Sequence, residues 1–300
     1  MLVATAGSVG RNRDTDDARW RRSPKARDGA RLVGRRLEMK YAVISDIHAN
    51  PAALRMALDD AKEQGCDRVV CLGDVTGYGY DPHASLDIVR RNVGFCLMGN
   101  HDSACVGLEP EWEVRLNSNY GEDVRAREKL SAGEKAWLSG LPYIHAENGA
   151  AFTHGFFMHP ESWGYVLSEN DAEMNFRARE ERILFCGHTH HACVWTRDAR
   201  GRVTRKTLLD MFPEAAEVAD GFTIEMKEGC RYLVNVGSVG YPRRDLVGCY
   251  AIWDVDASTI TMRRIPFNLV EYAQKLLNNN VRVPIWLNDI LLYMLRKIKP

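Results

Sequence analysis

Residues 41–48 read Tyr-Ala-Val-Ile-Ser-Asp-Ile-His, and this stretch decides the fold. Its first half, Tyr41–Ile44, is a short run of apolar, β-prone residues, which predicts a buried strand. The second half brings an acid and an imidazole, Asp46 and His48, into the loop that follows. Such a pair carries little weight alone, but later parts of the chain repeat the arrangement.

Four later segments also place polar ligands directly after an apolar run. The predicted strands are Arg68–Leu72, Gly94–Met98, Ala150–Thr153 and Ile183–Cys186. In open α/β sheets, ligands collect beyond the carboxyl ends of the strands, so we expect the five groups to converge. The polar residues that follow the four runs are Asp74, Asn100, His101, Asp102, His154, His188 and His190.

Taken in order, these motifs resemble those of the calcineurin-like metallophosphoesterases. They are Asp-x-His at 46–48, Gly-Asp-x-x-x-x-Gly at 73–79, Gly-Asn-His-Asp at 99–102, a lone His154, and Gly-His-x-His at 187–190. The spacing agrees, with 28 residues from Asp46 to Asp74 and 26 from Asp74 to Asn100. Each motif is short, whereas five in order are specific. The resemblance covers Met39 to about Pro266 and points to the bacterial branch of small phosphodiesterases and diadenosine tetraphosphatase-like proteins.

A further stretch is similar to a loop of one bacterial branch of the family. Residues 235–243 read Asn-Val-Gly-Ser-Val-Gly-Tyr-Pro-Arg, against Asn-Pro-Gly-Ser-Val-Gly-x-Pro-Arg in that branch. Val236 replaces the proline, so the role of this loop stays open, and its glycines also suit an ordinary tight turn. We expect substrate identity to depend on the 103–148 segment and on loops around Trp163-Gly164-Tyr165 and Arg243-Arg244.

The fold class follows from the order of the predicted elements. Asn50-Pro51 and Asp81-Pro82 are helix starts between the early strands, which predicts parallel crossovers. From 183 to 267 the strands follow one another with turns between them, and Val283–Leu295 is apolar at helical spacing, which indicates core packing. The resemblance implies an α/β (mixed α+β) protein: a four-layer α-β-β-α sandwich of two mixed sheets with a helical cap insertion.

The resemblance also implies two divalent metal ions. One is held by Asp46, His48, Asp74 and His190, whereas Asp74 bridges to a second held by Asn100, His154 and His188. Carboxylate, amide and imidazole ligands without a thiolate suit Mn, Fe or Zn and disfavour a closed structural zinc site. We expect Mn first, with Fe, Zn or Ni as alternatives.

The implied activity is hydrolysis of a phosphate ester, a phosphodiester or a phosphomonoester, by a metal-activated hydroxide. His101, next to Asn100, is the expected general acid, and Asp102 is expected to orient its imidazole. The substrate would be small and phosphorylated, either nucleotide-like or a phosphoprotein. The alternative is a catalytically silent scaffold that binds proteins, although such scaffolds typically lose metal histidines and this chain retains them.

Composition bounds the remaining expectations. The formal net charge is zero, which gives no support for general attraction to nucleic acid or to a membrane. No apolar run reaches ~18 residues, so we expect no transmembrane helix. Eight cysteines occur without a Cys-x-x-Cys pair, which indicates reduced structural thiols and a cytoplasmic protein. The oligomeric state stays open.

Domain boundaries follow from a change in composition. Residues 1–38 are rich in Arg, Gly and Asp without a sustained period, which predicts a disordered extension. Residues 39–300 are expected to form a single metallophosphoesterase domain, with residues 103–148 as its helical cap. Candidate substrate contacts in the cap, with solvated helix surface as the alternative, are Glu109, Trp112, Arg115 and Tyr120.

Overall fold

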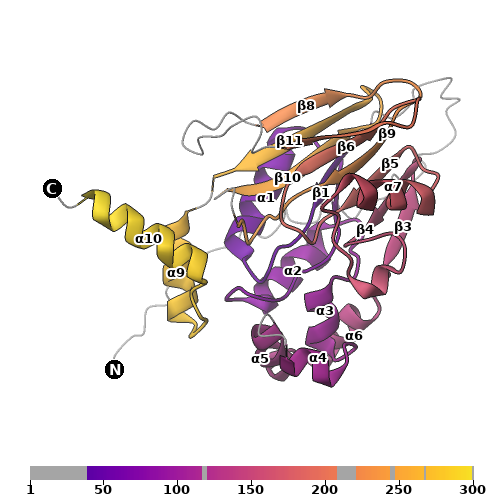
Figure 1. Ribbon diagram of the computed structural model, residues 1–300. Coiled ribbons are helices and arrows are strands. Elements are labelled where there is room, and N and C mark those ends of the chain that lie inside the picture. The colour runs from indigo at the N-terminus through magenta and orange to yellow at the C-terminus, as the bar shows by residue number, and fades with distance from the viewer. Residues whose placement is uncertain (1–38, 117–119, 208–220, 244–246, 267, 299–300) are drawn as a thin grey trace, which may run out of the picture.

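The computed structural model describes residues 39–116, 120–207, 221–243, 247–266 and 268–298 (Figure 1). The predicted disordered extension, residues 1–38, lies outside this range. Two sheets of mixed strand direction face each other, and helices lie on their outer sides.

The first sheet has the strand order β2-β1-β10-β11-β8. In it, β1 pairs in parallel with β2 and antiparallel with β10, so Tyr41–Ile44 lies inside the sheet. Its strands are β1 (Lys40–Ile44), β2 (Arg68–Cys71), β8 (Gly221–Glu225), β10 (Gly248–Asp254) and β11 (Thr259–Ile265).

The second sheet has the strand order β3-β4-β5-β9-β6-β7. Its central strand β5 pairs in parallel with β4 and β9, so the ends of β4 and β5 deliver their loops to the same edge. Its strands are β3 (Ile144–Glu147), β4 (Ala150–Thr153), β5 (Ile183–Cys186), β6 (Cys193–Arg197), β7 (Val203–Thr207) and β9 (Arg231–Asn235).

The main core lies between the sheets. Tyr41 and Trp253 of the first sheet stack at 5.0 Å between ring centroids, and Phe152 and Phe185 of the second stack at 5.1 Å. Successive residues of a strand point to opposite faces, so Ala42 joins the cluster on the other side of the first sheet. Fully burying a Phe side chain such as that of Phe152 or Phe185 stabilises the fold by about 1.5–3 kcal/mol relative to leaving it exposed.

Helices cover both outer faces. Helices α1 (Pro51–Glu63) and α2 (Pro82–Asn92) pack on the first sheet, and α7 (Glu169–Ala178) packs on the second. The side chains of Asn50 and Asp81 cap α1 and α2 by accepting hydrogen bonds from the third residue beyond them. The predicted four-layer sandwich is therefore confirmed.

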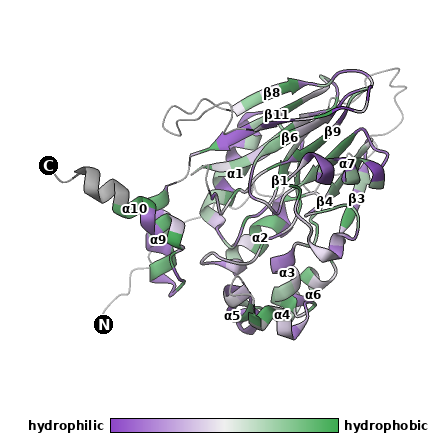
Figure 2. Cartoon of the chain, viewed as in Figure 1, coloured by the Kyte–Doolittle hydropathy of each residue, from purple (hydrophilic) through white to green (hydrophobic). Residues whose placement is uncertain are grey.

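The cap insertion consists of short helices at one end of the sheets (Figure 1). Ser131 and Glu134 form a capping box at the start of α6. In Figure 2, α5 is coloured mainly as hydrophilic, in keeping with a helix that covers the core rather than forming it. The helices are α3 (Asn100–Val106), α4 (Glu111–Leu116), α5 (Gly121–Lys129) and α6 (Ala132–Ser139).

Two local expectations differ from the structure. The predicted strand Gly94–Met98 runs beside β2 but forms only one isolated parallel bridge, between Cys71 and Cys96. The end of the expected helical cap, 103–148, is also wrong, because residues 144–147 form the edge strand β3 of the second sheet; they are mostly half-exposed and lack an apolar run that would mark a strand. The Asn148-Gly149 turn that joins β3 to β4, with both residues at positive φ, was the available hairpin signal.

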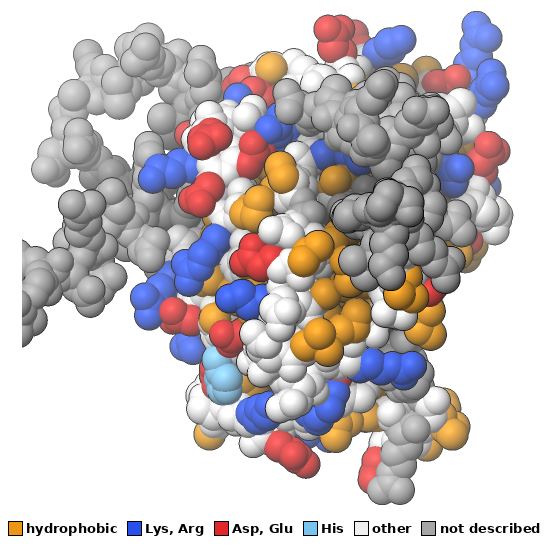
Figure 3. All heavy atoms as spheres, turned by 90° about the vertical axis from the view of Figure 1, so that its left-hand side faces the viewer, with side chains coloured by type: hydrophobic (Ala, Val, Ile, Leu, Met, Phe, Trp, Pro, Cys, Tyr) orange, Lys and Arg blue, Asp and Glu red, His pale blue; other side chains and the backbone are white. Residues whose placement is uncertain are grey.

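The C-terminal helices α9 (Leu269–Asn278) and α10 (Ile285–Ile298) form a cluster of their own around Tyr241 and Leu276. Figure 3 views this side of the molecule, where apolar side chains gather on the surface; Ile285 is 67% exposed whereas Leu287 is buried. Among the described side chains of Val283–Leu295, core packing therefore holds for one face only. Among the helices that the structure describes, none is both long and apolar enough to cross a membrane.

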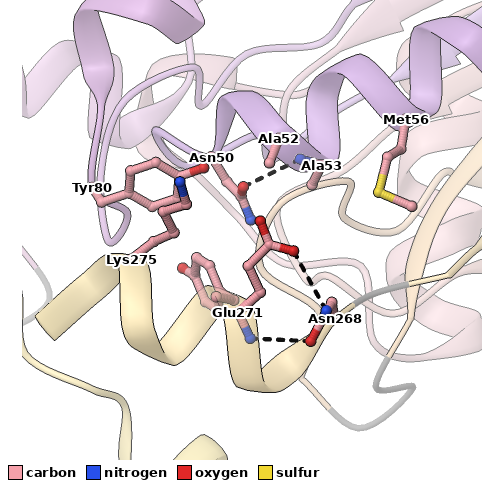
Figure 4. A pocket seen from close by; sticks show the side chains of 9 residues that line it. Asn50, Ala52, Ala53, Met56, Tyr80, Asn268, Glu271 and Lys275 are labelled. Carbon is pink, nitrogen blue, oxygen red and sulfur yellow. Dashed lines mark hydrogen bonds between the residues drawn. The ribbon is translucent and has the colours of Figure 1, made fainter. Parts of the chain in front are cut away.

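Figure 4 shows where α9 lies against the start of α1. Asn268 accepts a hydrogen bond from the backbone N–H of Glu271, and Asn50 accepts one from the N–H of Ala53. The amide of Asn50 also donates to the carbonyl of Gly240 at 3.0 Å. The C-terminal helices therefore lie beside the loop that carries the first motif.

Candidate metal centre

The structure brings the seven predicted metal ligands together at one edge of the two sheets. They follow strands β1, β2, β4 and β5, except for Asn100, which begins α3. All are less than a tenth exposed: Asp46, His48, Asp74, Asn100, His154, His188 and His190.

A first group contains Asp46, His48 and His190, whose ligand atoms all lie within 4.8 Å of one another. The Nε2 atoms of the two imidazoles face each other at 3.0 Å. The Nε2 of His190 lies 3.2 Å from the carboxylate of Asp46. This is the spacing of donors that could surround one cation.

A second group contains Asp74, His154 and His188, again within 4.8 Å. The Nε2 of His154 lies 3.3 Å from Asp74 Oδ2 and 3.3 Å from Asn100 Oδ1. The same Oδ2 of Asp74 is 3.7 Å from the Nε2 of His48 in the first group. Asp74 therefore lies between the two groups.

Backbone carbonyls set the tautomers of three of the imidazoles. In each of them Nδ1 bonds to a carbonyl oxygen, so Nδ1 carries the proton and the lone pair of Nε2 is left for a cation. The acceptors are Thr76 for His48 (3.1 Å), Leu72 for His154 (3.2 Å) and Tyr241 for His190 (2.8 Å).

Several donor atoms are buried and unsatisfied. Asp46 Oδ1, Asp74 Oδ2 and His188 Nε2 have no hydrogen-bond partner among the described residues. Leaving such a group buried and unpaired costs about 1–3 kcal/mol, and more for a charged group. Cations coordinated by these atoms would remove that penalty, and the oxygen and nitrogen donors suit divalent ions of the Mn, Fe or Zn type.

The electrostatics of the cluster favour the metal-binding forms of His48, His188 and Asp74, whereas His154 would first have to lose a proton. Burial lowers the pKa of His48 and of His188 to about 3, so both imidazoles are neutral. Burial alone would raise the pKa of Asp74, but the nearby imidazolium of His154 holds it well below its usual range. At His154 the charge of Asp74 outweighs burial and raises the pKa to about 9, so a cation would displace a proton there.

The ligand loops hold strained backbone. Five of the ligands have φ in the left-handed region: Asp46 (55°), His48 (48°), Asp74 (53°), His188 (65°) and His190 (62°). Each such residue costs about 1–3 kcal/mol and persists only where its surroundings hold it, which is typical of functional sites.

Two glycines allow the loops to approach one another. A Cβ at Gly99 would lie 2.1 Å from Oδ1 of Asp74, and one at Gly187 would lie 2.5 Å from Oδ2 of Asp46. Side chains at these positions would therefore displace the carboxylates.

The predicted general acid, His101, lies in the same site but has a different partner from the one expected. Its Nδ1 bonds to Oδ2 of Asp123 at 2.6 Å. Asp102 instead accepts hydrogen bonds from the backbone N–H groups of Val75, Thr76 and Gly99. The expectation that Asp102 orients the imidazole is thus wrong in its geometry, because the Asp102 carboxylate supports the loop that carries Asp74.

Asp123 comes from the cap and is fully buried. Burial disfavours a charged His101, yet the carboxylates of Asp123 and Asp74 outweigh it and raise the pKa of the imidazole to about 9. Sequence reasoning missed Asp123 because it stands in a charged helix, next to Glu122, with nothing local to mark it as buried. Only the packing of α5 on α3 identifies it, through bonds from Arg127 to carbonyls at the end of α3.

The loop at 235–243 supports the ligand loops. Ser238 donates to the carbonyl of Asp46 at 2.8 Å, and Asn235 donates to that of Gly187 at 2.6 Å. The N–H of Val236 donates to the carbonyl of Cys186 at 2.9 Å, a bond that proline could not make. The departure from the family pattern therefore adds a contact here.

A cavity of about 230 Å³ opens above the cluster. Of the candidate cap contacts, Tyr120 lines it, whereas Trp112 is 65% exposed and Glu109 instead accepts a hydrogen bond from Trp163. The side chain of Arg115 and residue Arg244 lie outside the described part of the chain. Besides the metal-ligand candidates Asp74, Asn100, His188 and His190, the cavity is lined by Tyr78, His101, Tyr120, Ser162, Trp163, Tyr165 and Arg243.

Two facing mixed sheets with a buried cluster of carboxylate, amide and imidazole donors at one rim define a class of metal-dependent phosphoesterase. The family model described as the calcineurin-like phosphoesterase superfamily domain matches residues 39–258. The chain belongs to this family, which confirms the resemblance of its motifs and its assignment as a phosphoester hydrolase.

Two relatives extend the comparison. The uncharacterized protein MJ0912 of Methanocaldococcus jannaschii is 31% identical over 256 residues, which cover 83% of this chain and 95% of that protein. The crystal structure of a metallophosphoesterase from Sphaerobacter thermophilus superimposes with a TM-score of 0.68 at 28% identity, over 81% of this chain and 95% of that one.

A third match shows the fold alone. The structure of hypothetical protein PH1004 from Pyrococcus horikoshii OT3 has a TM-score of 0.62 at 17% identity, over 84% of this chain and 97% of that one.

Proposed function

We propose that the chain hydrolyses a small phosphate ester at two divalent cations. Asp46, His48, Asp74 and His190 would hold one cation, and Asp74, Asn100, His154 and His188 the other. The observation that carries this is the position of Asp74 Oδ2, which is buried, accepts no hydrogen bond from the described residues, and lies within 3.7 Å of an imidazole from each group. When bound, two such cations activate a water and neutralise charge on the phosphoryl oxygens.

His101 supplies the proton for the leaving oxygen. Asp123 occupies its Nδ1, so Nε2 is the nitrogen available to donate. The ring lines the cavity and packs edge-on against His48 at 4.9 Å between centroids. His101 could also be a metal ligand, because its ring nitrogen lies within 4.8 Å of the ligand atoms of His48 and Asp74. Its bond to Asp123 and its place on the cavity wall favour proton transfer instead.

The expected cations are Mn first, then Fe, Zn or Ni, since the donors are oxygen and nitrogen only. A nucleotide-like molecule suits the cavity size better than a folded phosphoprotein does, although a phosphorylated peptide segment remains the second candidate substrate. A silent scaffold receives no support, because none of the seven ligand positions has lost its donor.

The test is reconstitution. Chelator-treated protein should be inactive on nitrophenyl phosphate and bis(nitrophenyl) phosphate and should regain activity as two equivalents of Mn bind, measured by elemental analysis. The ratio of the two rates would separate a phosphomonoesterase from a phosphodiesterase. Two bound cations without hydrolysis of either ester would favour the scaffold instead.

A further inference from the structure

Among the described residues, Arg243 places a guanidinium on the wall of the cavity. Arg243 ends the 235–243 loop, is partly buried, and makes no ion pair or hydrogen bond with any other described residue. Its charge is close enough to oppose the rise in pKa that burial causes at Tyr78 and at Tyr165. A cation that has no partner among the described residues and lies beside a phosphate-hydrolysing centre is available to bind an anion.

The loop that carries Arg243 is anchored to the metal centre. The N–H of Gly240 donates to the carbonyl of Asp46 at 3.0 Å, and the carbonyl of Tyr241 accepts from His190. The ring of Tyr241 also stacks on Tyr78, with centroids 4.3 Å apart. These contacts fix the point from which Arg243 enters the cavity, close to two of the proposed ligands.

On the cavity wall near the second cation group, an aromatic ring has an open face. Tyr165 stacks on His188 with centroids 4.1 Å apart and an interplanar angle of 17°. The Tyr165 side chain is nevertheless 47% exposed, so the face away from His188 is free. Nearby, Trp163 is buried against Tyr143 and is held by Glu109, so it acts as a support.

We propose that Arg243 and Tyr165 form a subsite for a nucleotide. Arg243 would bind the oxygens of the phosphoryl group, and the base would stack on the open face of Tyr165. A mononucleotide carries both groups in one molecule, whereas a sugar phosphate lacks the flat ring. The proposal rests on the proposed function, since the phosphoryl group must lie at the proposed cation site.

Two hydrolysis-resistant ligands test this subsite: the methylenephosphonates of adenosine and of ribose. Their affinities for the Mn-loaded protein are measured by calorimetry, so no turnover is required. Base stacking on an aromatic side chain predicts that the adenosine compound binds about 5- to 150-fold more tightly. Tyr165→Ala should abolish this preference, and the matched control Tyr165→Phe, which keeps the ring, should retain it.

Arg243 is tested with the same pair of ligands. Arg243→Ala should weaken both by an equal factor, about 10-fold or more, because both carry the phosphonate, and Arg243→Lys should restore part of the loss. Melting temperature and Mn content, unchanged in each variant, show that the fold and the centre are intact.

The outcomes separate the two proposals. Equal affinity for the two ligands in the unmodified protein, or a preference that survives Tyr165→Ala, would overturn the nucleotide subsite while leaving phosphoester hydrolysis in place. Tighter binding of a phosphoserine peptide than of the adenosine compound would overturn it too. If Mn binds but inorganic phosphate and both phosphonates do not, the proposed function fails together with the subsite.

Discussion

The Nδ1 of His101 lies 2.6 Å from Oδ2 of Asp123, and both side chains are buried. His101 is the second residue of helix α3, directly after the ligand candidate Asn100, whereas Asp123 comes from helix α5 of the cap. The cap therefore does more than cover the cavity, because it contributes the group that holds the proposed acid in place.

Asp123→Asn should leave both cations bound but lower the rate. The amide removes the charge that favours a protonated His101, and we expect a loss of about 10²-fold on alkyl phosphate esters. Esters with a nitrophenolate leaving group, which departs without a proton, should lose much less. Glu122→Gln, on the same helix turn, is the control. An equal loss on both kinds of ester would show that Asp123 acts only on the fold.

His101→Gln should show the same dependence on the leaving group more strongly. Loss of a general acid typically lowers the rate by about 10²–10⁴-fold, and the double variant with Asp123→Asn should be little worse than His101→Gln alone. Inhibition by inorganic phosphate should stay near that of the unmodified protein. Release of a cation from this variant would instead identify His101 as a ligand.

Asp74→Ala should reduce the occupancy of both cations, whereas Asp46→Ala should reduce mainly one. The reason is the position of Asp74 Oδ2 between the two imidazole groups. Elemental analysis of protein reloaded with Mn provides the measurement. Two full equivalents in Asp74→Ala would rule out the bridge.

Gly99→Ala should lower Mn affinity, since the added Cβ would lie 2.1 Å from Oδ1 of Asp74. Gly133→Ala, in helix α6 with no atom near its Cβ position, is the matched control and should be neutral or slightly stabilising. Calorimetric titration with Mn compares the two. Unaltered affinity in Gly99→Ala would mean that the loops move apart without consequence.

Removal of residues 1–38 should leave the melting temperature and the rate unchanged. Their composition predicts disorder, and the backbone N–H of Met39 is already bound to Asp256 at 2.9 Å. A shortened chain that begins at Met39 is compared with the full chain by thermal unfolding and by turnover. A drop of several degrees would indicate that this segment contributes to the fold.

Local signals in the sequence predicted the strands, the crossovers and the rim of ligands, and the family resemblance implied the sandwich. An apolar run such as Tyr41–Ile44 is followed within four residues by its ligands, Asp46 and His48. Helix starts such as Asn50-Pro51 mark the crossovers. The partner of His101 could not be predicted in this way. Asp102 is adjacent in sequence and Asp123 is not, and only the packing of α5 decides between them.

The remaining errors have similar causes. Residues 94–98 are apolar enough for a strand, but they form only one isolated bridge with β2. Composition does not encode how far two neighbouring segments stay in register. Strand β3 is an edge strand with one neighbour, so half-exposed residues suffice for it and no buried run marks it.

The carbonyl acceptors of His48, His154 and His190 make the tautomers of these ligands tolerant of mutation. A main-chain oxygen is present whatever side chain is encoded, so replacements at Thr76 or Leu72 leave the proton on the same ring nitrogen. His101 is more sensitive to mutation, because its partner is the side-chain carboxylate of Asp123, which a single substitution can remove. In a diverging lineage, cation binding should therefore outlast proton transfer.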